Sequence, residues 1–459
     1  MQIADSRLKI GALAAFIGAG ALVYAQQTPS WAPDVDRVFQ QWDTRTSPGC
    51  ALGVFQNGQI AYAHGYGMAD LEHDAPITPQ SVFYVGSLTK QFTAMSAALA
   101  IQQGPLGYDD SIRKYLPEMP AYADTIKISN LIHHTSGLRD YYALLTIAGR
   151  RYDTLYDNNA VLQFAARQKS LNFAPGDEYS YTNTGYQLLA VAIERATKTP
   201  FADYGDRQIF KPLAMTVTHF HTDTSRIVNG RVIGYSGTAG QWAIDVPNNE
   251  RAGAGGLYTN IPDLQRWDEN FYTAKVGGPE LIKKLQTRAH LNSGKEIAYA
   301  WGLEIGNYRG LPIVEHSGSL HGYRAELIRF PSQHTSVVIL CNHSSIVPSR
   351  LAHQVADVVL APKLGAVQAA PETVLPKEPP IIVGPSTPPR ADGAYYSKEL
   401  DATFVVHGMM LQRETGSPLM LWLNDGRLYR APGFLVRFED GRLLVSAGII
   451  HDIEFVKQP

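Results

Sequence analysis

Apolar residues recur at helical spacing in the stretch that follows Gly86. The positions that share this spacing are i, i+4, i+7 and i+11, occupied by Leu88, Phe92, Met95 and Leu99. The pattern stops near Gly104 and Pro105, two residues typical of a helix end. It predicts a buried helix with Ser87 in its first turn, where free backbone N–H groups and the helix dipole favour a developing negative charge.

Similar periodicity predicts helices over 34–44, 185–197 and 350–361, and strands elsewhere. Residues 50–55 and 60–63 read as a hairpin because Asn57-Gly58 is a strong signal for a tight turn. Three later apolar runs, separated by turn residues, predict strands over 311–316, 323–330 and 335–341. Between these regions, 109–260 mixes short helical patterns with Gly, Pro and Asn loops, which predicts a mostly helical insertion.

The pattern changes again after residue 361. Eight prolines between 362 and 390 predict an extended, semi-rigid linker. From 391 to the C-terminus the chain reads as a small accessory β-domain, with strands expected over 403–407, 420–423, 428–429, 435–438 and 443–446. No chemical constellation stands out in it. The catalytic chemistry is therefore expected within 34–361.

Composition fits a soluble globular protein of two or three domains. The chain has 459 residues, 45% of them hydrophobic and 18% charged, which is ample material for a large core. The net charge is -2, and no sustained basic run occurs. These values exclude the charge pattern of a nucleic-acid-binding protein.

The first 25 residues resemble a secretory signal peptide. Arg7 and Lys9 precede an apolar stretch over 10–25, and Val23-Tyr24-Ala25 predicts cleavage after Ala25. The alternative is a membrane anchor, but sixteen residues are fewer than the roughly 20 that a spanning helix needs. We expect a periplasmic or secreted protein without a stable membrane span after cleavage. Its two cysteines, Cys50 and Cys341, are either bridged or free, and their spacing excludes a close metal motif.

Ser87 and Lys90 are candidates for nucleophilic catalysis. Three residues apart on a helix, their side chains lie on one face, so a neutral lysine amine could take the serine proton. Burial would favour that neutral form. The same Ser-x-x-Lys spacing occurs at Ser6/Lys9 and at Ser111/Lys114, so the motif alone does not identify the nucleophile.

Two further motifs follow in the chain. Tyr181-Thr182-Asn183 lies in a turn-rich loop just before a predicted helix, and His316-Ser-Gly318-Ser319 ends a predicted strand. Together and in this order, the three motifs resemble the serine β-lactamase-like, penicillin-binding-protein family, over about residues 34–361. The nearest group comprises class C β-lactamases, D-Ala-D-Ala carboxypeptidases, D-aminopeptidases and esterases. The flanking stretches 134–138, 253–259 and 316–323 are similar to that family's sequences.

The resemblance implies a role for each residue. Ser87 would be the acylated nucleophile, and Lys90 and Tyr181 the proton-transfer pair, with Tyr181 phenolate-like or hydrogen-bonded to Lys90. Asn183 would bind the substrate amide or Lys90, although it could instead cap the following helix. The substrate-binding and oxyanion residues would be Asn183, His316, Gly318 and Ser319, with the backbone N–H groups of Ser87 and Ser319 forming the oxyanion hole. Neither a metal nor another cofactor is expected.

His316 departs from the β-lactamase pattern, which usually has lysine there. Because an unperturbed histidine has a pKa near 6.5, recognition of a substrate carboxylate should weaken between about pH 5.5 and 7.5. This favours an exported serine hydrolase acting on D-amino-acid peptides or amides, on esters or on β-lactams. The alternatives are a penicillin-binding sensor that is acylated but turns over poorly, and a true class C-like β-lactamase. The partner is a small-molecule or peptide substrate, and the oligomeric state is open.

The fold implied by the resemblance is α+β. A five-stranded antiparallel sheet, flanked by helices, would meet a mostly helical subdomain at the active site, and the small all-β domain would follow. Family topology would place residues 51–55 beside 335–341. Cys50 and Cys341 would then be near neighbours, and a disulfide between them would be possible in an oxidising compartment.

Overall fold

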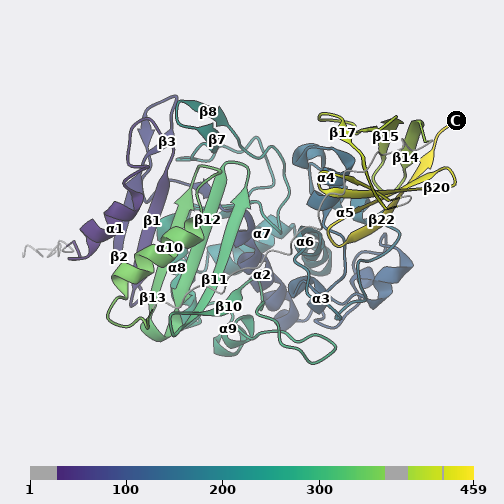
Figure 1. Cartoon of the computed structure of the whole chain (residues 1–459). Coiled ribbons are helices and arrows are strands. Elements are labelled where there is room, and N and C mark those ends of the chain that lie inside the picture. The colour runs from purple at the N-terminus through teal and green to yellow at the C-terminus, as the bar shows by residue number, and fades with distance from the viewer. Residues whose placement is uncertain (1–27, 367–390, 426–427) are drawn as a thin grey trace, which may run out of the picture.

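The computed structural model describes residues 28–366, 391–425 and 428–459. Its central layer is a six-stranded antiparallel sheet (Figure 1). In spatial order the strands are β10 (Glu304–Tyr308), β11 (Leu311–Leu320), β12 (Tyr323–Phe330), β13 (Thr335–Cys341), β1 (Cys50–Gln56) and β2 (Gln59–Tyr66). The predicted count of five is therefore wrong by one. The additional strand is β10, whose Gly306 and Asn307 weaken its strand signal, and which forms by pairing with β11.

The predicted pairing of the first and last long strands is confirmed. β1 runs antiparallel to β13, with Cys50 directly opposite Cys341. The two residues form a disulfide, with their Cα atoms 4.0 Å apart. It joins positions 291 residues apart in the chain and links β1, the first strand of the sheet in the chain, to β13, the last one.

Helices cover both faces of this sheet. One face packs against α1 (Ala32–Phe39) and α10 (Pro348–Val359), through a cluster that includes Val35, Phe39, Leu351 and Val355. The other face packs against α8 (Ile261–Thr273) and α2 (Lys90–Gln103) (Figure 1). Alternate residues of each strand serve the two clusters: Val337 and Ile339 of β13 face α10, whereas Val338 and Leu340 face the larger core.

The predicted helical insertion is largely confirmed. Its helices are α3 (Ile128–Ile132), α4 (Tyr141–Ala148), α5 (Asn158–Ala166), α6 (Asn183–Thr197) and α7 (Phe201–Gly205), and α9 (Pro279–Leu285) follows it. The same block also contains short strands that its sequence pattern did not predict: β6 (His219–Phe220), β7 (Tyr235–Thr238), β8 (Gln241–Ile244) and β9 (Leu257–Thr259). They pair in small sheets with each other or with β5 (Phe83–Tyr84), and another small sheet joins β3 (Met68–Asp70) to β4 (Ala75–Pro76).

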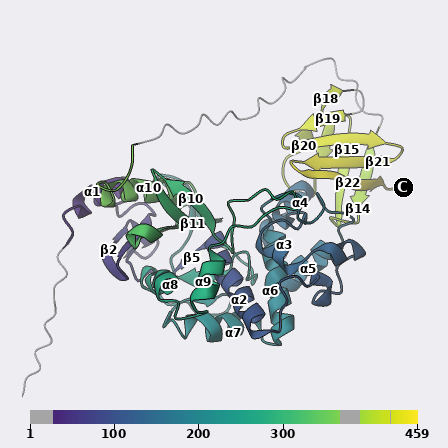
Figure 2. The same ribbon diagram turned by 90° about the horizontal axis from the view of Figure 1, so that it is seen from below.

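The C-terminal region is all-β, as predicted. We call its nine strands the C-terminal β-sheet. In chain order they are β14 (Gly393–Ser397), β15 (Ala402–His407), β16 (Met410–Gln412), β17 (Leu419–Met420), β18 (Trp422–Asp425), β19 (Leu428–Ala431), β20 (Phe434–Glu439), β21 (Arg442–Ala447) and β22 (Ile450–Lys457). Strands β14, β16 and β22 were not among the predicted ones. Figures 1 and 2 both show this sheet beside α4 and α5.

Two predicted segments lie outside the described residues. These are the signal peptide, 1–25, and most of the Pro-rich linker, 362–390. The boundaries 34–361 and 391–459 for the two domains stay a prediction. None of the helices in the described ranges combines the length and apolar character that crossing a membrane requires.

Candidate active site

Ser87 lies in a short 3₁₀ turn, Gly86–Thr89, that leads directly into α2. Gly86 has φ +52°, and a Cβ atom there would lie 2.6 Å from the backbone nitrogen of Ser319. A Cβ on Gly318 would overlap the carbonyl oxygen of Val85. These two glycines therefore let the turn that carries Ser87 lie directly against β11, so that the backbones of Ser87 and Ser319 line one pocket.

Lys90 is completely buried and lies one turn after Ser87. Its Nζ donates hydrogen bonds to Ser87 Oγ (2.9 Å), Asn183 Oδ1 (2.9 Å) and the Ala254 carbonyl oxygen (2.8 Å). Burial lowers the pKa of Lys90 to about 7, although the Asp140 carboxylate opposes that shift. A large fraction of the lysine is therefore neutral near physiological pH.

The partners of Lys90 also direct its lone pair. Asn183 Oδ1 and the Ala254 carbonyl can only accept hydrogen bonds, so a neutral amine gives its two N–H bonds to them. Its lone pair then faces Ser87 Oγ, the third neighbour. This is the geometry that a general base for the serine hydroxyl requires.

Tyr181 stands beside this pair as a neutral phenol. Burial raises its pKa well above 10, more than its hydrogen bond with Ser87 lowers it. Lys90 Nζ lies over the ring, 4.8 Å from its centre. The sequence-based alternative of a phenolate-like Tyr181 is therefore corrected: the burial that lowers the pKa of Lys90 also keeps the phenol protonated.

Asn183 is oriented by Asp140. One carboxylate oxygen, Asp140 Oδ2, accepts from the Asn183 backbone N–H (2.5 Å) and side-chain amide (3.1 Å), which leaves Asn183 Oδ1 facing Lys90. The other oxygen, Oδ1, caps α4 by accepting from the N–H groups of Tyr142 and Ala143. Asn183 itself is the first residue of α6 and not its cap, and its side chain accepts from Lys90 instead of capping the helix.

His316 does not supply the expected titrating charge. It is buried, and its Nδ1 lies 2.6 Å from the Ser317 carbonyl oxygen while its Nε2 lies 3.0 Å from the Tyr299 hydroxyl. Because a carbonyl only accepts, Nδ1 carries the hydrogen and Nε2 accepts from Tyr299. Burial and the nearby Lys90 lower the pKa of His316 to about 3. The expected loss of charge between pH 5.5 and 7.5 is therefore wrong, because the ring is already neutral throughout that range.

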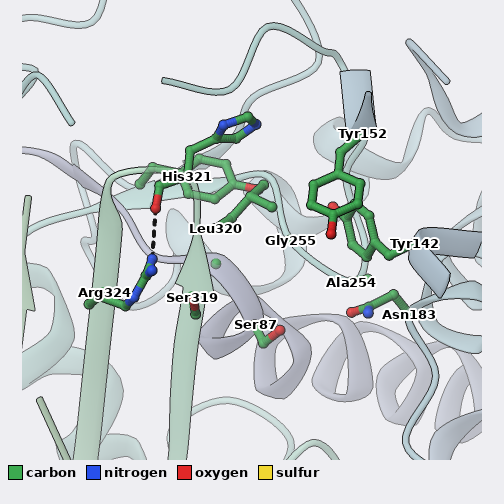
Figure 3. A pocket seen from close by; sticks show the side chains of 12 residues that line it. Ser87, Tyr142, Tyr152, Asn183, Ala254, Gly255, Ser319, Leu320, His321 and Arg324 are labelled. Atoms are coloured by element: carbon green, nitrogen blue, oxygen red, sulfur yellow. Dashed lines mark hydrogen bonds between the residues drawn. The ribbon is translucent and has the colours of Figure 1, made fainter. Parts of the chain in front are cut away.

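The pocket above Ser87 has a volume of about 300 Å³ (Figure 3). Tyr142, Tyr152 and Asn183 lie on one side of it, and the end of β11, with Ser319 and Leu320, lies on the other. His321 and Arg324 complete the wall next to β11. The two tyrosines give the pocket an aromatic wall on the side of the helical insertion.

The competing Ser-x-x-Lys motif has a structural role. Ser111 Oγ accepts from the Arg113 backbone N–H and caps a short 3₁₀ turn, and Lys114 pairs with Asp110 at 2.7 Å. The third copy, Ser6/Lys9, lies outside the described residues. Within the part of the chain that the structure describes, no group of three or more His, Cys, Asp or Glu side chains could hold a metal ion.

Sequence reasoning missed Asp140, Ala254 and Tyr142. An aspartate directly before the apolar run 141–148 is a helix-cap signal, so its position was predictable, although its contact with Asn183 was not. The Ala254 carbonyl is presented by a loop in which Gly253 and Gly256 have positive φ. Such glycines signal an unusual backbone path and do not reveal which side chain it meets.

Comparison with known proteins agrees with this geometry. The sequence profile named Beta-lactamase matches residues 35–360. The chain belongs to the Beta-lactamase family.

The chain is similar to D-aminopeptidases from Gluconobacter oxydans (28% identical over 320 residues) and Cereibacter sphaeroides (26% over 319 residues). Each match covers 69% of this chain, and the chain spans only about 60% of the length of these relatives (59% and 60%). They support the family assignment.

Solved structures show the same fold. An octameric penicillin-binding protein homologue from Pyrococcus abyssi aligns with a TM-score of 0.64 at 22% identity, covering 93% of this chain and 99% of that one. D-amino acid amidase from Ochrobactrum anthropi aligns with a TM-score of 0.62 at 19% identity, covering 73% and 99%. The coverage by the Pyrococcus abyssi protein extends the likeness into the C-terminal β-sheet.

Proposed function

We propose that the protein hydrolyses its substrate through an acyl-enzyme on Ser87. Neutral Lys90 takes the Ser87 proton as Oγ forms a bond to the substrate carbonyl carbon. The backbone N–H groups of Ser87 and Ser319 bind the resulting oxyanion. The leaving group departs with the proton that Lys90 holds, and water then hydrolyses the Ser87 ester. The proposal rests on the distance of 2.9 Å between Lys90 Nζ and Ser87 Oγ. The other two partners of Lys90 Nζ, Asn183 Oδ1 and the Ala254 carbonyl oxygen, only accept hydrogen bonds, which leaves the lone pair of the neutral amine for the Ser87 proton.

The substrate class that we propose is an amide or short peptide of a D-amino acid. The curated relatives reported above are D-aminopeptidases, and a pocket of about 300 Å³ with tyrosines on one wall suits a single small side chain. A dedicated β-lactamase is less well supported, because the usual lysine of the third motif is replaced by a buried, neutral His316. Ester hydrolysis is the second candidate. Because His316 is neutral, it does not select for a charged group on the substrate, so an ester can also be accepted.

We also propose that the protein acts outside the cytoplasm. Disulfides persist in oxidising compartments and are rare in the cytosol, and Cys50–Cys341 is such a bond. This agrees with the signal peptide that the sequence predicts over 1–25.

A fluorophosphonate probe tests the nucleophile without requiring knowledge of the substrate. The wild-type protein should be labelled once, on Ser87, and Ser87→Ala should lose both labelling and turnover. Ser111→Ala, which removes the competing motif, should label at the wild-type rate. Label that survives in Ser87→Ala and maps to Ser111 would overturn the assignment.

A substrate panel then tests the class. It comprises D-alanine and L-alanine p-nitroanilide, a p-nitrophenyl ester and a chromogenic cephalosporin. Preferential turnover of the D-anilide supports the proposal, whereas preference for the ester selects the second candidate. One equivalent of product followed by a stall on every substrate would indicate a sensor that is acylated but not turned over.

A further inference from the structure

The helix α4 lies between the active site and the C-terminal β-sheet. Its apolar residues do not join the main core: Tyr141, Leu144, Leu145 and Ile147 are buried in one cluster with side chains of that sheet, such as Leu400, Phe404, Leu443 and Phe455. Figures 1 and 2 show α4 directly against these strands. The helix that is capped by Asp140, the residue that orients Asn183, is thus anchored in a sheet whose first strand begins some 250 residues later in the chain.

A buried ion pair fixes the start of this helix. Arg139 Nη1 donates to Glu399 Oε2 at 2.9 Å, and the two side chains are only 5% and 4% exposed. The second guanidinium nitrogen, Nη2, donates to Ser170 Oγ (2.9 Å) and to the His451 carbonyl oxygen (3.1 Å). Glu399 also accepts from the Lys169 N–H at 3.1 Å. Arg139 is therefore held by the connection between β14 and β15 and by the start of β22.

Successive residues at this point face opposite ways. Arg139 and Tyr141 contact the C-terminal β-sheet, whereas Asp140 and Tyr142 reach the active site. The backbone is fixed by Thr184, whose hydroxyl donates to the Arg139 carbonyl (2.8 Å) and accepts from the Tyr141 N–H (2.9 Å). Because Thr184 follows Asn183 in α6, a shift of the backbone at Arg139 would be passed to Asp140, to Tyr142 and to the start of α6.

We propose that the C-terminal β-sheet is a positioning part of the active site, acting through Glu399, Arg139 and the start of α4 on Asp140 and Tyr142. Glu399 and Arg139 are positioning residues, because neither touches the nucleophile. The proposal rests on the proposed roles of Ser87 and Lys90, and it assigns a function to a region in which the sequence shows no chemistry.

The effect should be visible in the titration of Lys90, because the negative charge of Asp140 stabilises the protonated amine and so raises its pKa. The other ionisable or aromatic groups that face Lys90 come from different segments: Tyr181 and Tyr186 under its ammonium, and His134 and His316 behind it. Burial keeps both histidines neutral and both tyrosines protonated near pH 7. Asp140 is thus the charged neighbour whose displacement changes the titration of Lys90.

The test is the pH dependence of fluorophosphonate labelling between pH 5 and 9. Glu399→Gln keeps the shape of the side chain and removes its charge, leaving Arg139 buried and unpaired. We expect the plateau rate to fall about three- to tenfold through misplacement of Asn183 and the pocket wall. The midpoint should move to lower pH by about 0.3–0.5 units, because Lys90 loses part of the stabilisation of its charged form. Asp140→Asn should shift the midpoint the same way and further.

Glu454→Gln is the matched control. Glu454 pairs with the Lys169 side chain at 2.7 Å across the same interface, whereas Lys169 meets Glu399 through its backbone N–H, so removing this partly exposed pair leaves the Glu399–Arg139 contact in place. It should label with the wild-type plateau and midpoint. In the double variant Asp140→Asn/Glu399→Gln, the midpoint should equal that of Asp140→Asn alone, because both changes act on one interaction.

Several outcomes would overturn the proposal. One is a lower melting temperature in Glu399→Gln with an unchanged plateau and midpoint, which is what a merely structural ion pair predicts. Another is a midpoint shift that adds to that of Asp140→Asn. Should Glu399→Gln not fold, Glu399→Asp keeps the charge with a shorter reach, and a wild-type profile there counts equally against it. Absence of Ser87 labelling in the wild type refutes the proposed function instead, so the two failures are distinguishable.

Discussion

At the scale of single residues, the chemistry depends on which groups are neutral. Burial disfavours the charged forms of Lys90 and His316 and so makes both side chains weaker bases. Their pKa values are lowered to about 7 and about 3. Asp140 offsets part of the shift for Lys90 only. The site thus keeps one group, Lys90, that exchanges protons near neutrality, with Asp140 as its charged neighbour.

The first prediction concerns the pH profile of acylation. Below its pKa Lys90 is protonated and cannot accept the Ser87 proton, so the rate should fall about tenfold for each pH unit below about 7 and level off above it. Stopped-flow labelling with the fluorophosphonate probe measures the profile. A rate that stays constant down to pH 5 would mean that another group is the base.

The second prediction concerns His316. Because its ring is neutral from pH 5.5 to 7.5, KM should show no loss of anion affinity attributable to it in that range. We expect the ratio of KM for a carboxylate-bearing substrate to that for its matched amide to change less than about twofold. Steady-state kinetics on the pair at five pH values measures this ratio. A tenfold rise in the ratio would instead support the prediction from the sequence that His316 loses its charge in this pH range.

At the scale of elements, the two faces of β11 have different electrostatic surroundings. Its inner face presents His316 and Gly318 to the site. On the outer face, three carboxyl groups form a column: Glu304 of β10, Glu315 of β11 and Glu326 of β12. Glu304 lies opposite Glu315, and Glu326 is fully buried on the face covered by α10. Burial, reinforced by mutual repulsion, raises the pKa of Glu315 to about 7 and that of Glu326 well above its usual value.

The third prediction follows from this column. A carboxyl group whose pKa is raised by folding binds its proton more tightly in the folded state, so stability should fall as pH rises above about 4.5. Glu326→Gln removes this penalty and should raise the free energy of unfolding by about 1–2 kcal/mol more at pH 8 than at pH 5. Urea unfolding at both pH values measures it. The exposed Glu178→Gln is the control and should show no such difference.

The elements also show how far sequence patterns reach. Strands β12 and β13 have the predicted bounds, because long apolar runs between turn residues leave little choice of register. Ser87 and Tyr181 stand just before a helix, as the sequence indicates, whereas His316 lies within β11, which continues beyond the predicted 311–316. The role of Asp140 could not be predicted, because it depends on α4 packing against a sheet whose first strand begins some 250 residues later. The neutrality of His316 was missed because it depends on the tertiary environment of the ring, which periodicity does not reveal.

At the scale of the whole molecule, segments from both ends of the catalytic region must meet. The strand that follows α1 and the last strand before α10 are neighbours in one sheet, although 291 residues separate Cys50 from Cys341. Cross-linking them closes a long loop in the unfolded chain and so lowers the conformational entropy of the unfolded state. In the chain-entropy view, the stabilisation by a disulfide increases slowly with loop length. A loop this long therefore gives a stabilisation near the upper end of the usual range.

The last prediction is the cost of losing this bond. Cys50→Ser/Cys341→Ser should lower the free energy of unfolding by about 3–5 kcal/mol, provided that two-state unfolding is observed. The bond lies on the strand pair β1–β13, and β12 lies between β13 and β11, the strand that carries Ser319, so fluorophosphonate labelling of the folded variant should keep the wild-type rate. Urea unfolding of the wild type with and without reductant, beside the double variant, measures both effects. The reduced wild type should unfold at the midpoint of the variant. A variant as stable as the oxidised protein would mean that the paired strands hold the termini together without the cross-link.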